Sequence, residues 1–212
     1  SWAPSGERVV IPYGLPEAFC GAEPLIDPPP PRAVFTSNPL RSLDWLLDVW
    51  VGSIRPRVSA AELHVFAGAA TYGSVGEAKA DAMNSVLART RALESDGVTL
   101  RGPVPKAALI EELRTARLML YRGDLNETFC LAVGEAQAMG VPAVVENLGS
   151  VSERVIDGET GFIAPDDTVF ADHAVALLSN DELWRSQHLA ALNQQRNWRW
   201  PQAAAAFEKL IT

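Results

Sequence analysis

Two glutamates eight residues apart, Glu127 and Glu135, are the side chains whose type and spacing best fit work on a ligand. The run that contains them reads Asn-Glu-Thr-Phe-Cys-Leu-Ala-Val-Gly-Glu-Ala over residues 126–136. If a helix begins just after Glu127, a rise of about 1.5 Å per residue puts the two carboxylates roughly 12 Å apart. That separation suits carboxylates that hold opposite ends of an extended ligand such as a nucleotide-diphosphate sugar.

Backbone donors are expected between the two carboxylates, from Thr128, Phe129, Cys130 and Leu131. The first N–H groups of a helix have no partner inside it and carry partial positive charge, which suits a diphosphate. A purely structural interpretation fits the two glutamates alone equally well or better. A Glu beside a helix N-terminus compensates the helix dipole, and a Glu inside a helix is usually solvated.

The elements that must position these residues alternate regularly along the chain. Short apolar runs predict strands at 33–37, 62–67, 97–101, 117–121, 142–146 and 161–164. Helical spacing predicts helices at 43–50, 77–94, 106–116 and 129–139, a short one at 152–156, and mostly helix after residue 164, with Pro201 in the first turn of the last. This alternation predicts an α/β fold with a Rossmann-like parallel sheet flanked by helices, in which ligands bind at the carboxyl ends of the strands.

The first 32 residues differ in character from the rest of the chain. Residues 9–14 predict a short buried strand, and Pro28–Pro31 predicts a stiff spacer. We therefore expect residues 1–32 to form an N-terminal strand and Pro-rich arm of the same domain as residues 33–212. His64 is expected in the core or at the sheet edge, and His173 and His188 on solvated helices.

Composition excludes several classes of protein. With 18 Lys plus Arg against 26 Asp plus Glu, the net charge is −8, which disfavours broad nucleic-acid binding. Two cysteines and three scattered histidines offer no metal-ligand spacing, so no metal site is expected. No 18-residue apolar run and no signal peptide are apparent, which predicts a cytoplasmic chain without an integral membrane segment.

The segment around the two glutamates resembles the retaining glycosyltransferases of family 4, which have the GT-B fold. Residues 126–145 match the family's Glu, seven residues, Glu motif, followed by an Ala-rich helix, a Gly and a strand that opens with Pro. Weaker matches follow in family order over nearly the whole chain, at Ile11–Gly14, Leu100–Val104, Leu148–Glu153, Asp157–Phe162 and Trp200.

The resemblance implies that residues 33–212 are the nucleotide-sugar-binding half of such an enzyme, with the acceptor-binding N-terminal domain absent from this chain. Glu127 would contact donor-sugar hydroxyls, and Glu135 would bind the ribose hydroxyls. The remaining implied contacts are Thr128, Phe129, Cys130 and Leu131 against the phosphates or sugar, and Gly102, Pro103 and Val104 at the base.

The implied activity is glycosyl transfer with retention of configuration. The donor would be a nucleotide sugar such as a UDP- or GDP-sugar, the acceptor is unknown, and no cofactor or metal is implied. The isolated domain is expected to be inactive.

Arg41 is the second residue to which the resemblance gives a catalytic role. The family has an Arg and, five residues later, a Lys before Gly, both near the diphosphate. Here Thr36, Arg41 and Ser42 hold those positions. An Arg can clamp a phosphate in bidentate fashion, so Arg41 would stabilise the leaving diphosphate. The alternative is a solvated residue at a helix start.

Two other functions fit the same sequence. One is a non-catalytic nucleotide-sugar-binding or scaffolding module that kept the GT-B fold, which the departures at Thr36 and Ser42 favour. The other is a GT-B enzyme of different chemistry, such as an epimerase or a phosphorylase. A phosphorylase would need a pyridoxal-binding lysine, and none of Lys79, Lys106 and Lys209 has a recognisable setting for one.

Overall fold

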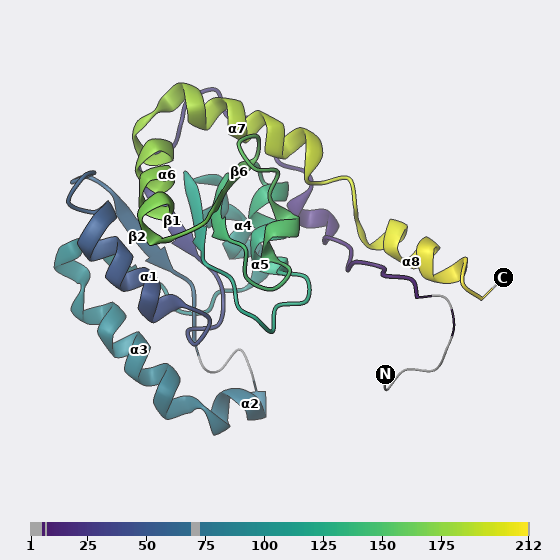
Figure 1. The fold of residues 1–212 in the computed structure, drawn as a ribbon, viewed down its shortest axis with the longest axis horizontal. Coiled ribbons are helices and arrows are strands. Elements are labelled where there is room, and N and C mark those ends of the chain that lie inside the picture. The colour runs from purple at the N-terminus through teal and green to yellow at the C-terminus, as the bar shows by residue number, and fades with distance from the viewer. Residues whose placement is uncertain (1–5, 7, 69–72, 212) are drawn as a thin grey trace.

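The computed structural model of the chain describes residues 6, 8–68 and 73–211, and Figure 1 shows a sheet flanked by helices. Six strands pair in parallel in the order β3-β2-β1-β4-β5-β6. They are β1 (Arg32–Phe35), β2 (Glu62–Val65), β3 (Val98–Leu100), β4 (Leu118–Tyr121), β5 (Ala143–Glu146) and β6 (Gly161–Ala164). The predicted α/β class and parallel sheet are confirmed.

The strand order reverses direction between β1 and β4, which lie side by side in the centre of the sheet. Chains that leave the carboxyl ends of two such strands turn to opposite faces, so a crevice opens between them. The loop after β1 contains Arg41 and the loop after β4 contains Glu127. The fold therefore brings together two residues that are 86 positions apart in the sequence.

Helices form a layer on each face of the sheet (Figure 1). In one layer α1 (Leu43–Val49) contacts α3 (Ala80–Ala92), and the π-helix Trp50–Ile54 that continues α1 contacts α6 (Asp167–Ser179). In the other layer α5 (Leu131–Ala138) contacts α7 (Asp181–Gln194) and the short helix Glu17–Phe19, which also meets α4 (Lys106–Arg114). The predicted helix 77–94 is instead two helices, α2 (Gly73–Ala78) and α3, and the segment 152–156 is a single 3-10 turn, Val151–Arg154.

The N-terminal arm contradicts one prediction. Residues 9–14 were expected to form a buried strand, but they are extended without a strand partner, and Val10 is 89% exposed. Burial begins at Gly14, and the N–H of Leu15 donates to the carbonyl of Trp198 at 3.0 Å. An apolar run alone cannot identify a strand, because backbone pairing depends on what lies beside it.

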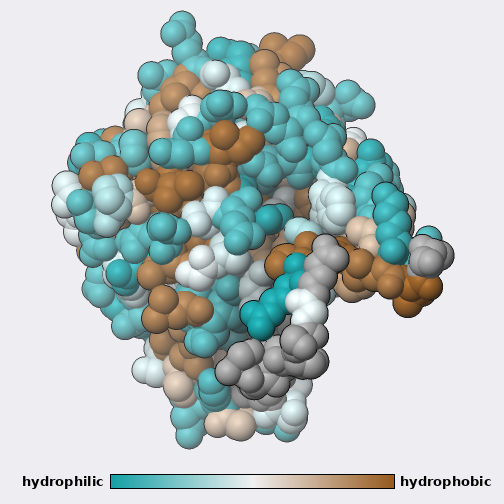
Figure 2. Space-filling model, turned by 45° about the vertical axis from the view of Figure 1, so that its right-hand side comes forward, coloured by the Kyte–Doolittle hydropathy of each residue, from teal (hydrophilic) through white to brown (hydrophobic). Residues whose placement is uncertain are grey.

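The last helix, α8 (Trp200–Glu208), projects from the body beside that arm (Figure 1). Pro201 stands in its first turn, as predicted. Apolar side chains gather at the projecting end of α8 in Figure 2, where Phe207, Leu210 and Ile211 are all more than half exposed. None of the helices in the described ranges is both long and apolar enough to cross a membrane.

His188 also departs from its prediction, because its side chain is buried and not solvated. Its Nδ1 donates to the carbonyl of Gly140 at 2.6 Å, and its Nε2 accepts from the backbone N–H of Leu25 at 2.9 Å. The ring stacks on Trp184 at 4.6 Å between centroids. This neutral imidazole joins the arm, the end of α5 and α7, whereas His64 lies in the core as expected.

We predict that His188→Phe lowers the free energy of unfolding and makes it less dependent on pH. Burial lowers the pKa of His188 from 6.5, so the unfolded chain takes up a proton first as the pH falls. The stability that this histidine contributes is present above about pH 6.5 and is lost as the pH falls below it. Urea unfolding should show a loss of about 1–3 kcal/mol at pH 7 in His188→Phe.

Urea unfolding repeated between pH 7 and pH 5 should show a smaller loss of stability in His188→Phe than in the wild type. His173→Phe, on the neighbouring helix α6, is the control and should keep the wild-type pH dependence. A pH dependence unchanged by His188→Phe would contradict the role given to this ring.

Candidate functional site

A cavity of about 400 Å³ opens at the carboxyl ends of β1 and β4, where the strand order reverses. It gathers residues from the arm, the loops after β1 and β4, α4 and α5. Its lining consists of Tyr13, Thr36, Ser37, Arg41, Lys106, Leu109, Glu127, Thr128, Phe129, Cys130, Leu131, Ala132 and Glu135. Both predicted glutamates, the predicted cation and the predicted backbone segment therefore meet in one cavity.

Glu127 is held by three hydrogen bonds. Nη1 of Arg41 donates to both carboxylate oxygens at 2.9 Å, and the hydroxyl of Tyr121 donates to Oε2 at 2.6 Å. Only 8% of the Glu127 side chain is exposed. Burial, with the Glu127 carboxylate as its hydrogen-bond acceptor, raises the pKa of Tyr121, so the phenol stays protonated and remains a donor.

The backbone around Glu127 forms a tight turn braced by the loop after β5. The N–H of Glu127 donates to the carbonyl of Asp124 at 2.9 Å, and the carbonyl of Glu127 accepts from Ser150 at 3.1 Å. Gly149 has a φ of +61°, and a Cβ there would lie 2.3 Å from the carbonyl oxygen of Asp124 and 3.0 Å from the Cβ of Glu127. Only glycine at position 149 lets the two loops come this close, and their contact fixes the position of Glu127 in the cavity.

Glu135 lies on the second turn of α5, and 4% of its side chain is exposed. The ammonium of Lys106 donates to Oε1 at 2.5 Å and to Oε2 at 2.6 Å. Burial raises the pKa of Glu135, and the hydrogen bonds and charge of Lys106 oppose that rise. The pair joins the start of α4 to α5.

The helix between the two carboxylates begins two residues later than predicted. Cys130 precedes it with φ of +59° and ψ of +69°, a left-handed conformation that a non-glycine residue rarely adopts, so Phe129 and Cys130 form a turn and α5 begins at Leu131. In the described chain, the backbone N–H groups of residues 128–132 donate to no protein acceptor. They remain available to a ligand in the cavity.

The side chain of Cys130 is buried beneath this turn. Burial raises the pKa of its thiol to about 12, so the thiol stays protonated at neutral pH. The side chain of Cys130 therefore packs in the interior as a neutral thiol. Burial likewise raises the pKa of Cys20 in the arm.

The predicted base-binding turn Gly102–Val104 lies beside the main cavity rather than in its wall. Pro103 and Val104 line a smaller cavity of about 140 Å³ that shares Thr36, Lys106 and Leu109 with the main one. Gly102 has a φ of +71°, which makes the turn, and it lines neither cavity. The two cavities are therefore neighbours along one surface.

Several residues of the site were missed by the sequence analysis. Lys106 was considered only as a pyridoxal-binding lysine, although its place at the first position of a helix after the turn was a usable signal. Tyr121 was counted only as a strand residue. Tyr13 comes from the arm and packs 5.7 Å from Phe129 between ring centroids, a contact without any signal in the local sequence.

The departures at Thr36 and Ser42 have structural consequences. Thr36 lines both cavities without adding a charge. Ser42 adopts φ of +63°, and its hydroxyl donates to the carbonyl of Gly123 at 2.9 Å. The loop after β1 is thereby tied to the loop after β4, the connection across which Arg41 reaches Glu127.

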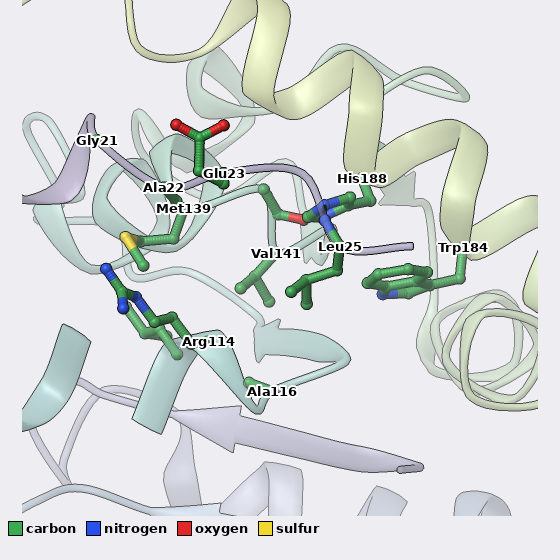
Figure 3. Close-up of a pocket in the computed structure, with 12 residues that line it drawn as sticks. Gly21, Ala22, Glu23, Leu25, Arg114, Ala116, Met139, Val141, Trp184 and His188 are labelled. Atoms are coloured by element: carbon green, nitrogen blue, oxygen red, sulfur yellow. Dashed lines mark hydrogen bonds between the residues drawn. The ribbon is translucent and has the colours of Figure 1, made fainter. Parts of the chain in front are cut away.

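A separate cavity of about 170 Å³ lies at the other edge of the sheet, near Ala116 and Val141, which precede β4 and β5. Figure 3 shows Leu25, His188 and Trp184 side by side along its wall. Both ring nitrogens of His188 already have backbone partners. No group of three His, Cys, Asp or Glu side chains that could hold a metal occurs among the described residues, at either edge of the sheet.

Comparisons with known proteins identify the family and the fold. Residues 30–180 match the family of group 1 glycosyl transferases. The D-inositol 3-phosphate glycosyltransferase of Corynebacterium diphtheriae is 39% identical over 110 residues, which are 51% of this chain and 25% of that protein. The chain thus matches only a quarter of this relative's length.

Solved structures show the same fold at low sequence identity. Sucrose-phosphate synthase from Thermosynechococcus elongatus superposes with a TM-score of 0.77 at 18% identity, over 98% of this chain and 52% of that one. The pneumococcal O-GlcNAc transferase GtfA, in complex with UDP and GlcNAc, superposes with a TM-score of 0.67 at 14% identity, over 90% of this chain and 37% of that one. Because the family model matches most of this chain, the chain belongs to the group 1 glycosyltransferases and has a GT-B Rossmann-like domain.

Proposed function

We propose that this chain is the donor-binding half of a retaining glycosyltransferase and that it binds a nucleotide-diphosphate sugar in the cavity between β1 and β4. The observation that carries the proposal is that Glu127 and Glu135 line one cavity together with residues 128–132, whose backbone N–H groups have no acceptor in the described chain. Membership of the family and the UDP bound to the structural neighbour GtfA support the same ligand class.

Each wall of the cavity suits one part of such a donor. Glu135 offers acceptors for the ribose hydroxyls, and Glu127 offers them for the sugar. The free N–H groups at the start of α5 suit the diphosphate between them. Pro103 and Val104, beside Lys106, form an apolar recess for the base.

Arg41 can serve the leaving diphosphate without releasing Glu127. Both of its bonds to the carboxylate come from Nη1, so Nε and Nη2 are not used on Glu127. A guanidinium carries five N–H donors, so the remaining ones can face a phosphate while Nη1 stays on Glu127. Positive charge held in this way favours departure of the diphosphate in the transition state.

The arrangement also supports retention by attack on the face that the diphosphate leaves. Glu127 accepts bonds from Arg41 and Tyr121, which leaves it suited to accept sugar hydroxyls and poorly suited to attack carbon. The leaving phosphate can then take the proton of the acceptor. We place the reaction in the cytoplasm.

Transfer requires a second, acceptor-binding domain. The matched segment covers a quarter of the C. diphtheriae relative, and the projecting end of α8 exposes Phe207, Leu210 and Ile211, which supports a partner domain on that side (Figure 2). The isolated chain should therefore bind donor and transfer little.

A non-catalytic binding module is the second candidate, because Thr36 leaves the cavity with one cation fewer than the family pattern that the sequence resembles. The two functions differ once the acceptor-binding half is supplied. A longer form of the protein that binds donor but neither transfers nor hydrolyses it would favour the binding module.

The proposal is tested by calorimetric titration of the chain with UDP, GDP and ADP, first without metal and then with magnesium. Saturable binding of one diphosphate without metal is expected. Binding of none, by this chain and by a form that includes the acceptor domain, would contradict the proposal.

Glu135→Ala should weaken binding of the preferred nucleoside diphosphate by about 1–3 kcal/mol, because the ribose loses its acceptor. Glu111→Ala, an exposed glutamate on α4 outside both cavities, is the control and should leave affinity unchanged. Equal affinities in the two variants would remove Glu135 from the site.

Glu127→Ala should matter only when the donor carries its sugar. We expect the affinity for the nucleotide sugar to fall while that for the sugar-free diphosphate changes by less than about twofold. The same titrations measure both, and an equal loss for the two ligands would contradict the sugar-binding role.

A further inference from the structure

Lys106 makes both of the hydrogen bonds that the described chain gives to the carboxylate of Glu135. A carboxylate that is 4% exposed and has no cation beside it is costly in free energy, and it escapes that cost by taking up a proton or leaving its position. The state and direction of Glu135 therefore depend on one ammonium group.

The start of α4 supplies that ammonium. Lys106 is the first residue of α4, directly after Pro105, and 63% of its side chain is exposed. Its ammonium lies 5.3 Å from the centre of the Phe19 ring, so the arm supplies an aromatic face beside the ion pair. The side chains of Lys106 and Glu135 both line the main cavity, so the ion pair forms part of its wall.

The remaining acceptor capacity of Glu135 fits a pair of hydroxyls. A carboxylate has about four lone-pair sites, and Lys106 uses one on each oxygen. One further site on each oxygen is left, which matches two neighbouring hydroxyl donors better than one.

We propose that Lys106 is a positioning residue that keeps Glu135 ionised and aimed at a cis-diol, so that the site selects ribonucleotides over their 2′-deoxy counterparts. The assignment rests on the proposed donor-binding function and adds a residue and a selectivity to it. Lys106 acts here through Glu135.

The test is a double-mutant cycle read by calorimetry with UDP and 2′-deoxy-UDP. The cycle consists of Lys106→Met, Glu135→Gln and the double variant. Lys106→Met alone should lower the affinity for UDP about tenfold at pH 7. In the Glu135→Gln background the same change should lower the affinity for UDP by less than about twofold, because the lysine has no carboxylate to hold. The wild type should prefer UDP over 2′-deoxy-UDP, and Lys106→Met should lose most of that preference.

Two controls separate positioning from general damage. Lys106→Arg restores a cation and should bind UDP within about threefold of the wild type. Lys79→Met removes an exposed lysine away from both cavities and should change nothing. If Lys106→Met yields little folded protein by thermal melting, Lys106→Gln takes its place in the cycle.

A pH series gives a readout that a structural role would not produce. Burial raises the pKa of Glu135 and only Lys106 opposes this, so without the lysine Glu135 should titrate closer to neutral pH. UDP affinity should then change with pH between 6 and 9 in Lys106→Met and stay nearly level in the wild type.

Additive losses in the cycle, or equal losses for UDP and 2′-deoxy-UDP, would overturn the assignment while leaving the donor site intact. If the wild type binds none of UDP, GDP and ADP, the proposed function fails and the role of Lys106 fails with it.

Discussion

The structure depends on keeping two carboxylates charged at the poorly solvated edge of a parallel sheet. Glu127 and Glu135 are each less than a tenth exposed in their side chains, and burying a carboxylate without a partner is costly in free energy. Each is compensated by one cation from another segment, Arg41 from the loop after β1 and Lys106 from the start of α4. The two cations thus balance the two carboxylates, and in the described chain the N–H groups of residues 128–132 have no protein acceptor.

The sheet topology makes this compensation possible. β1 and β4 are neighbours in the sheet, although 82 residues lie between Phe35 and Leu118 in the sequence. The segments that follow the two strands therefore meet at one edge of the sheet. Glycine at 149 lets the loop after β5 press against the turn that contains Glu127. Left-handed backbone at Ser42 and Cys130 shapes both helix starts at this edge, a local strain that the surrounding packing must offset.

The sequence allowed the fold class, the strand positions and the two glutamates to be predicted, because these depend on local periodicity and on one contiguous motif. It did not reveal that residues 9–14 lack a strand partner or that His188 is buried, since both follow from packing against distant segments. Arg41 was predicted as a phosphate clamp, and its bond to Glu127 across 86 residues appears only in three dimensions. Both Lys106 and Glu135 were visible in the sequence, but their pairing was not.

The central claim is that the start of α5, between the two carboxylates, receives a nucleoside diphosphate. The most direct test is a titration of the isotope-labelled chain with UDP followed by backbone amide NMR signals. We predict saturable shifts at residues 128–132 and at Glu135, with the signals around His188 at the opposite edge of the sheet unchanged. Shifts confined to the cavity beside His188, or no shifts with any nucleoside diphosphate, would contradict the account.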